Sequence, residues 1–147
     1  MGIIKRTVLA SIILPALLLG GCKKNTTTCN GVPNVGVSFT IDLNQPQYNP
    51  LVVTGGAMLV SGGNAGITIY RYQQDQFQAY DCLCPYDGAS NSKAVVSICK
   101  NHIMDSCAVC HSRFSLADGS VVQGPSGCPL KAYKTSYDGA RYVTVTN

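Results

Sequence analysis

Four cysteines form two close pairs that have the spacing of metal ligands. One residue separates Cys82 from Cys84, two residues separate Cys107 from Cys110, and His111 follows the second pair directly. Two short loops that each present two donors can surround one centre, because each loop fixes its own donor spacing and the fold brings the loops together. The sequence therefore predicts a metal or cofactor site on two cysteine-bearing loops.

The sequence pattern predicts that β-strands position these loops. In residues 35–43 the apolar side chains alternate with small or polar ones, which is typical of a half-buried strand. Turn-forming Gly, Asp and Pro residues separate the remaining candidates, and no segment has a helical period. The last two strands are expected to pair as a hairpin across Asp138-Gly139. Further strands are expected at 51–60, 67–72, 76–81, 94–99, 113–116, 130–135 and 141–146.

This pattern predicts an all-β protein: a small antiparallel sandwich or barrel with two cysteine-bearing loops. A length of 147 residues favours one domain. The formal net charge of +4 is too small for an electrostatic nucleic-acid binder, and no apolar run is long enough for a transmembrane helix. All seven acidic residues are Asp and are scattered, so a paired-carboxylate hydrolase is not expected. These features favour a binding module over a catalyst.

The N-terminus has the pattern of an export signal. Lys5 and Arg6 precede a short apolar segment, which ends in Gly20-Gly21-Cys22 and resembles the lipobox of bacterial lipoproteins. The resemblance implies a signal peptide over residues 1–21 and a lipidated Cys22. A flexible polar tether would follow over 22–34, and the domain over 35–147. The protein would then be exported and anchored to a bacterial membrane, facing the periplasm or the cell surface. Disulfides are allowed there, and seven cysteines remain after Cys22, so at least one is not paired within the chain.

From about residue 35 onward the chain resembles the Rieske iron–sulfur family. Cys84-Pro85-Tyr86 stands where that family has Cys-x-His, and residues 107–114 stand where it has Cys-x-x-His-Gly-x-x-Phe. Gly124-Pro125 matches the following Gly-Pro loop, and residues 130–133 match a Leu-x-x-Tyr strand. The resemblance implies a Rieske-like fold, a 2Fe–2S cluster and one-electron transfer with a redox protein partner.

The ligand set differs from that of the family, in which two Cys bind one iron and two His the other. Cys84 and Cys107 match the two Cys positions. Tyr86 and Cys110 stand at the two His positions, and His111 follows one place later, where the family has Gly. One interpretation keeps the 2Fe–2S cluster on Cys84, Cys107 and Cys110, with His111 or Cys82 as the fourth ligand.

Three other interpretations of the same cysteines remain open. A zinc ion could be bound by Cys82, Cys84, Cys107 and Cys110. A c-type haem could be attached at Cys107 and Cys110, with His111 as its axial ligand. The domain could also bind no cofactor and act as a disulfide-stabilised binding or structural module, with Cys84 paired to Cys107 or Cys110 and another disulfide among Cys82, Cys99 and Cys128.

Overall fold

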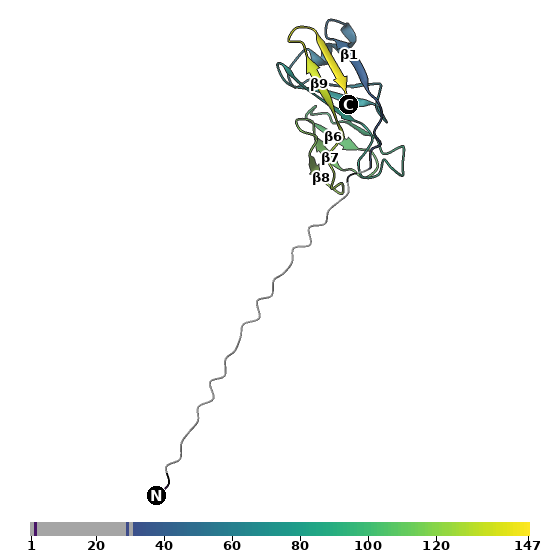
Figure 1. The fold of residues 1–147 in the computed structure, drawn as a ribbon, viewed down its shortest axis with the longest axis vertical. Helices are drawn as coiled ribbons and strands as arrows, with labels where there is room; N and C mark the ends of the chain where they lie inside the picture. Colours follow the sequence, from purple (N-terminus) through teal and green to yellow (C-terminus); the bar gives the residue numbers. More distant parts are fainter. Residues whose placement is uncertain (1, 3–28, 30) are drawn as a thin grey trace.

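The computed structural model describes residue 2, residue 29 and residues 31–147 (Figure 1). The expected signal peptide, Cys22 and most of the expected tether lie outside these residues. The regular secondary structure of the described chain is almost all β, with a single short 3-10 helix, η1 (Pro46–Leu51). Its strands are β1 (Ser38–Asp42), β2 (Ala57–Val60), β3 (Ile67–Gln73), β4 (Gln76–Asp81), β5 (Val96–Ile98), β6 (Met104–Cys107), β7 (Arg113–Ser115), β8 (Val121–Gln123), β9 (Ala132–Tyr137) and β10 (Tyr142–Thr146).

The strands form two antiparallel sheets. The larger sheet has the order β1-β10-β9-β4-β3-β2, and the smaller one has the order β5-β6-β7-β8. Figure 1 shows β6, β7 and β8 gathered at one end of the described domain, with β1 and β9 toward the other end. An isolated bridge between Leu83 and Val95 joins the chain after β4 to the chain before β5. The prediction of an all-β antiparallel fold is confirmed.

The expected strands agree well with the larger sheet. The range expected for β4 is identical to the observed one, and β9 and β10 pair in antiparallel register as the expected hairpin. The prediction of one strand over 51–60 was wrong, because only Ala57–Val60 is extended. Pro46 and Pro50 favour the tight turn of η1, and Gly55 has a φ of 84° that most side chains disfavour. The sequence pattern did not predict strands β6 or β8.

Two groups of buried side chains hold the sheets together. The first lies under the larger sheet and includes Ile41, Ile67 and Val143, all at most 1% exposed. Val35 and Phe39 pack against this group, which agrees with the alternation seen in residues 35–43. The second group joins the two sheets through Tyr80, Phe114, Leu116 and Leu130, and it also contains Cys84 and Cys107. The cysteine loops are therefore built onto the core of the smaller sheet.

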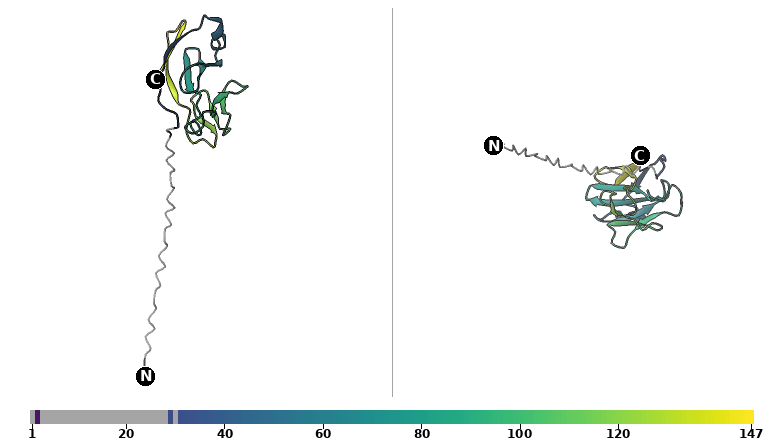
Figure 2. Two further views of the ribbon diagram at one scale, coloured as in Figure 1. Left: turned by 90° about the vertical axis from the view of Figure 1, so that its right-hand side faces the viewer. Right: turned by 90° about the horizontal axis from the view of Figure 1, so that it is seen from below.

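The chain that precedes β1 is attached to this domain. The carbonyl of Pro33 accepts hydrogen bonds from Lys131 Nζ at 2.6 Å and Asn64 Nδ2 at 3.0 Å. Cys29 and Cys128 form a disulfide in the structure. The open sandwich and the position of this segment can be followed in Figure 2. In the described part of the chain, no helix is long and apolar enough to cross a membrane.

Candidate metal centre

The two cysteine loops are folded as equivalent turns. We define the first cysteine loop as residues 84–88 and the second as residues 107–111. In the first, the N–H of Gly88 donates to the carbonyl of Cys84 at 2.8 Å, and in the second the N–H of His111 donates to the carbonyl of Cys107 at 3.1 Å. Both hydrogen bonds close a helix-like turn, which places the first and fourth side chains of each loop on one side.

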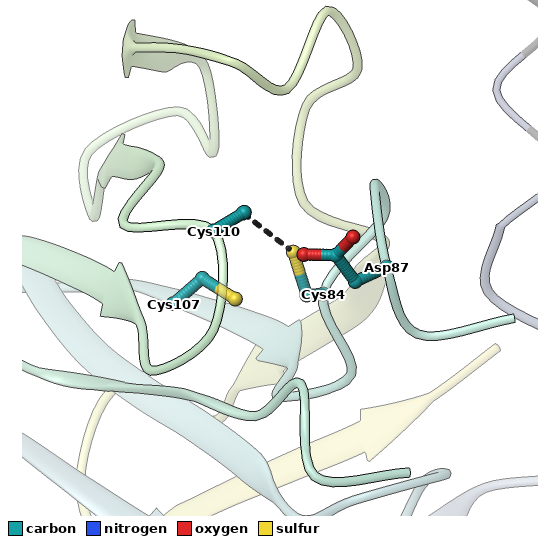
Figure 3. Close-up of side chains that lie close together, drawn as sticks. All are labelled: Cys84, Asp87, Cys107 and Cys110. Carbon is teal, nitrogen blue, oxygen red and sulfur yellow. Dashed lines mark hydrogen bonds between the residues drawn. The ribbon is translucent and has the colours of Figure 1, made fainter. Parts of the chain in front are cut away.

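Four potential ligands converge where the loops face each other. One donor atom from each of Cys84, Asp87, Cys107 and Cys110 lies within 4.8 Å of all the others. Figure 3 shows the Cys107 thiol and the Asp87 carboxylate directed toward the Cys84 sulfur, which lies 3.7 Å from the Cys110 sulfur. These residues are the first and fourth positions of the two loops. The site can therefore offer three sulfur donors and one oxygen donor to a metal.

The local environment of the buried thiols favours a negative charge on Cys107. Burial raises the pKa of Cys84 to about 12. Burial also acts to raise the pKa of Cys107, but hydrogen bonds from the backbone N–H groups of Cys110 and Val109 and from the Cys84 thiol outweigh it, and the pKa is lowered. The N–H groups of Asp87 and Tyr86 face the Cys84 sulfur in the same manner. Each loop thus directs two backbone donors at its own cysteine sulfur, an arrangement that stabilises thiolates.

One oxygen of the Asp87 carboxylate, Oδ2, is buried without a hydrogen-bond partner in the structure. Most buried polar atoms in proteins are hydrogen-bonded, and an isolated buried carboxylate oxygen is unfavourable. A cation among these donors would supply the missing interaction.

Surrounding contacts hold each loop in place. Asp81 Oδ1 accepts a hydrogen bond from the N–H of Leu83 at 2.8 Å, which fixes the chain just before Cys84. Directly after the second loop, Ser112 Oγ lies 3.1 Å from the Cys110 sulfur and accepts a hydrogen bond from the N–H of Ser126 at 2.8 Å. Ser112 is fully buried. It links the second cysteine loop to the Gly-Pro loop that the sequence analysis identified.

Glycines allow close backbone approach around the first loop. A Cβ atom at Gly88 would lie 2.5 Å from the carbonyl oxygen of Cys84, which is too close for any side chain. A Cβ atom at Gly31 would lie 2.1 Å from the carbonyl oxygen of Pro85. The segment after Cys29 therefore packs directly against the first cysteine loop.

The structure brings together three of the cysteines expected at the site and leaves the expected fourth ligands outside the group. Cys82 is buried with its sulfur 3.4 Å from Thr68 Oγ1, and burial raises its pKa to about 11. It directly follows β4 and its N–H donates to the carbonyl of Gly66, whereas Cys84 begins the turn. His111 is exposed and adopts a φ of 58° at the position that ends its turn. Tyr86 is 55% exposed.

The other expected arrangements also differ from the observed one. In the described chain Cys82, Cys84, Cys99, Cys107 and Cys110 are all free thiols, so the expected pairing of Cys84 with Cys107 or Cys110 is absent there. Cys128 pairs with Cys29 rather than with Cys82 or Cys99, because the chain before β1 passes beside the chain that follows Cys128, where Lys131 Nζ donates to the carbonyl of Pro33. For a c-type haem the two thiols would have to face the porphyrin, but the buried Cys107 sulfur faces Cys84.

Asp87 is the site residue that the sequence analysis did not identify. It lies in Asp87-Gly88, a dipeptide that is typical of turns and does not by itself indicate a metal ligand. A usable signal was nevertheless present in the sequence. Cys84-Pro85-Tyr86-Asp87-Gly88 and Cys107-Ala108-Val109-Cys110-His111 have the same spacing between the first and fourth positions.

Comparisons of the fold agree with this description. No protein-family profile matches the chain, and no curated protein matches its sequence. The plasma membrane Rieske protein PetC3 of Synechocystis PCC 6803 superposes with a TM-score of 0.52 and 16% identity, over 78% of this chain and 99% of that one. A chain from the complex of reduced oxygenase and oxidized ferredoxin in carbazole 1,9a-dioxygenase superposes with a TM-score of 0.50 and 17% identity, over 75% and 93%. These similarities and the architecture above show that the chain has the fold of Rieske-type proteins.

Proposed function

We propose that this protein transfers single electrons through a 2Fe–2S cluster held on its two cysteine loops. The observation that carries the proposal is the convergence of Cys84, Asp87, Cys107 and Cys110, whose donor atoms all lie within 4.8 Å of one another. The neighbour in the dioxygenase complex is a component of a redox system that contains a ferredoxin and an oxygenase. A cluster of this kind supplies a one-electron couple when it is bound.

The residues present fit such a group in number and in charge. A 2Fe–2S cluster needs two protein ligands for each iron, and each loop offers two donors. The pKa of Cys107 is lowered, and backbone N–H groups face both buried sulfurs. The fit extends to Asp87 Oδ2, which accepts no hydrogen bond in the structure and would be partnered by a bound cation. In the proposed holoprotein, Cys84, Cys107 and Cys110 bind the cluster, and the core of the smaller sheet excludes water from its inner side.

The loops also leave the outer side of the site accessible, which electron exchange requires. Tyr86 on the first loop is 55% exposed, and Val109 on the second is 41% exposed. Exposed aromatic and apolar side chains are enriched where proteins bind one another. We propose that a redox protein docks over these two side chains, within a short distance of the cluster.

The proposed location rests on the N-terminal sequence. The basic Lys5-Arg6 pair, the apolar segment and Cys22 favour export and lipid attachment to a bacterial membrane. The disulfide between Cys29 and Cys128 supports an oxidising compartment. The protein would then act as a tethered electron carrier beside a membrane-associated partner.

A second candidate is a single tetrahedral metal ion, and one distance favours it. The Cys84 and Cys110 sulfurs are 3.7 Å apart. Two sulfurs bound to one tetrahedral ion at about 2.3 Å are separated by about 3.8 Å. A zinc ion at this position would stabilise the loops but would transfer no electrons.

Anaerobic purification of the full chain in detergent separates these candidates. The 2Fe–2S proposal expects broad visible absorption that bleaches on reduction, with iron and acid-labile sulfide in equal amounts. Cys107→Ser should abolish the absorption, and Cys99→Ser, which alters a free thiol outside the group, should leave it unchanged. A colourless wild-type protein that contains zinc would support the single ion and reject electron transfer.

A further inference from the structure

We propose that Asp87 is the fourth ligand of the metal centre, so that each cysteine loop binds the metal through its first and fourth residues. The inference rests on the proposed function only in that the loops hold a metal. It applies equally to a 2Fe–2S cluster and to a single ion. The ligand set would then be three thiolates and one carboxylate, with no histidine.

The equivalence of the two loops supports this assignment. Cys84 and Cys107 occupy the same place in turns that are closed by the same hydrogen bond, from the fifth N–H to the first carbonyl. Cys110, at the fourth position of the second loop, lies in the donor group. Asp87 is at the fourth position of the first loop. The geometry that presents Cys110 to the site therefore presents Asp87 to the same site from the opposite side.

The state of the carboxylate is the second, independent observation. Asp87 Oδ2 is buried without a hydrogen-bond partner, although the residue itself is only half-buried and adjoins an exposed loop. A carboxylate at such a position could turn toward water at little cost. Instead it is directed at the Cys84 sulfur, as Figure 3 shows. A metal ion between these atoms makes this orientation favourable, because oxygen and sulfur donors can share one ion.

The alternative fourth ligands are disfavoured by their positions. His111 is exposed, and its backbone, with a φ of 58°, ends the second turn. The Cys82 sulfur is buried against Thr68 on β3. Cys82 would have to give up its contact with Thr68 Oγ1, and neither His111 nor Cys82 lies within the donor group, whereas Asp87 does.

The carboxylate also has a chemical consequence for an iron centre. In Rieske proteins two neutral imidazoles raise the reduction potential above that of all-cysteine ferredoxins. Here four anionic donors would stabilise the more oxidised, more positive state of the iron. An iron centre in this protein is therefore expected to be reduced at lower potential than a histidine-ligated Rieske centre.

Cobalt(II) is a suitable probe, because its visible spectrum reports both its coordination and its thiolate ligands. The full chain in detergent would be stripped of metal and titrated with Co²⁺ under reducing conditions that leave the site thiols free. Asp87→Ala should weaken Co²⁺ binding by at least about tenfold, since even the loss of an outer-shell partner costs 10–100-fold. Asp87→Cys should restore binding and increase the sulfur-to-cobalt charge-transfer intensity by about one third, from three thiolates to four.

Two controls make the result specific. Asp75→Ala removes an exposed carboxylate on the β3–β4 turn and should bind Co²⁺ like the wild type. His111→Ala tests the rival ligand and should also retain binding. Wild-type affinity and spectrum in both Asp87 variants, or loss of binding only in His111→Ala, would overturn the inference.

The native metal distinguishes failure of this inference from failure of the proposed function. If the purified wild type contains iron and sulfide but Asp87→Ala keeps them with an unchanged spectrum, the ligand assignment is wrong and electron transfer stands. If the wild type contains no iron, but its Co²⁺ affinity depends on Asp87, electron transfer is wrong and the ligand assignment stands. If wild type binds neither iron nor Co²⁺, both fail.

Discussion

Replacing Asp81 by Asn should strongly destabilise the domain, because this carboxylate joins three parts of the fold. Its side chain is 1% exposed. Its Oδ2 atom accepts hydrogen bonds from the N–H of Asn64 at 2.9 Å, from Asn64 Nδ2 at 2.8 Å and from the Tyr133 hydroxyl at 2.6 Å. Its Oδ1 atom accepts one from Leu83, at the entrance to the first cysteine loop.

The expected magnitude follows from the donors that Asn would leave without an acceptor. The amide keeps one oxygen for Leu83, and the Tyr133 hydroxyl can reverse to accept from the new NH₂ group. The two Asn64 donors would face that NH₂ group instead of an oxygen. Hydrogen bonds to charged groups contribute about 1.5–3 kcal/mol each, so the free energy of unfolding should fall by about 3–6 kcal/mol. That is a large part of the 5–15 kcal/mol typical of a whole domain.

Urea unfolding at neutral pH, with metal removed from every variant, measures this loss directly. Asp75→Asn is the matched control, since Asp75 is exposed, and it should change the stability by less than about 0.5 kcal/mol. Tyr133→Phe removes one donor and should cost about 1–3 kcal/mol. If Asp81→Asn is as stable as the Asp75 control, the argument that this carboxylate anchors the first loop is refuted.

Three further predictions concern the loops and the long-range ion pair. Gly88→Ala should abolish metal binding, as measured by metal content, because its Cβ would lie 2.5 Å from the carbonyl oxygen of Cys84; unchanged metal content would contradict the close approach. His111→Gly should stabilise the metal-free domain by about 1 kcal/mol in urea unfolding, since its φ of 58° is strained for a side chain with a Cβ; a loss of stability would argue that the imidazole has a structural role. The Arg141 guanidinium lowers the pKa of Asp42 to about 2. This pair should therefore stabilise the fold above about pH 4, and its contribution should be lost as the pH falls toward 2. The stability of the wild type and of Arg141→Ala, measured by urea unfolding followed by circular dichroism at a series of pH values, should differ above about pH 4 and converge toward about pH 2. The same difference at every pH would contradict this role of the pair.

The larger sheet could be predicted from sequence because its strands follow simple rules. β4 has clear turn signals at both ends, and the first strand alternates apolar and polar side chains. β6 could not be predicted in this way. Two of its residues, Asp105 and Cys107, are each 1% exposed, and Asp105 is a residue type that normally faces water. A strand whose inward side is partly charged lacks the alternation on which the prediction depends.

The site was predicted in part for a related reason. The spacing of Cys107 and Cys110 is a local signal, and both residues lie in the group of converging donors. The contribution of Asp87 depends on a contact between loops that are distant in sequence, and Asp before Gly is a common turn element. Cys82 was included because only one residue separates it from Cys84. It directly follows β4, and its sulfur lies against Thr68 instead.

Electron paramagnetic resonance of the purified, dithionite-reduced full chain tests the central claim most directly. A reduced 2Fe–2S centre has one unpaired electron, and this account predicts a low-temperature signal that integrates to about one spin per chain. The signal should disappear in Cys107→Ser and persist in Cys99→Ser. A protein that gives no signal after reduction and contains about one zinc per chain would contradict the account and assign the site a structural role.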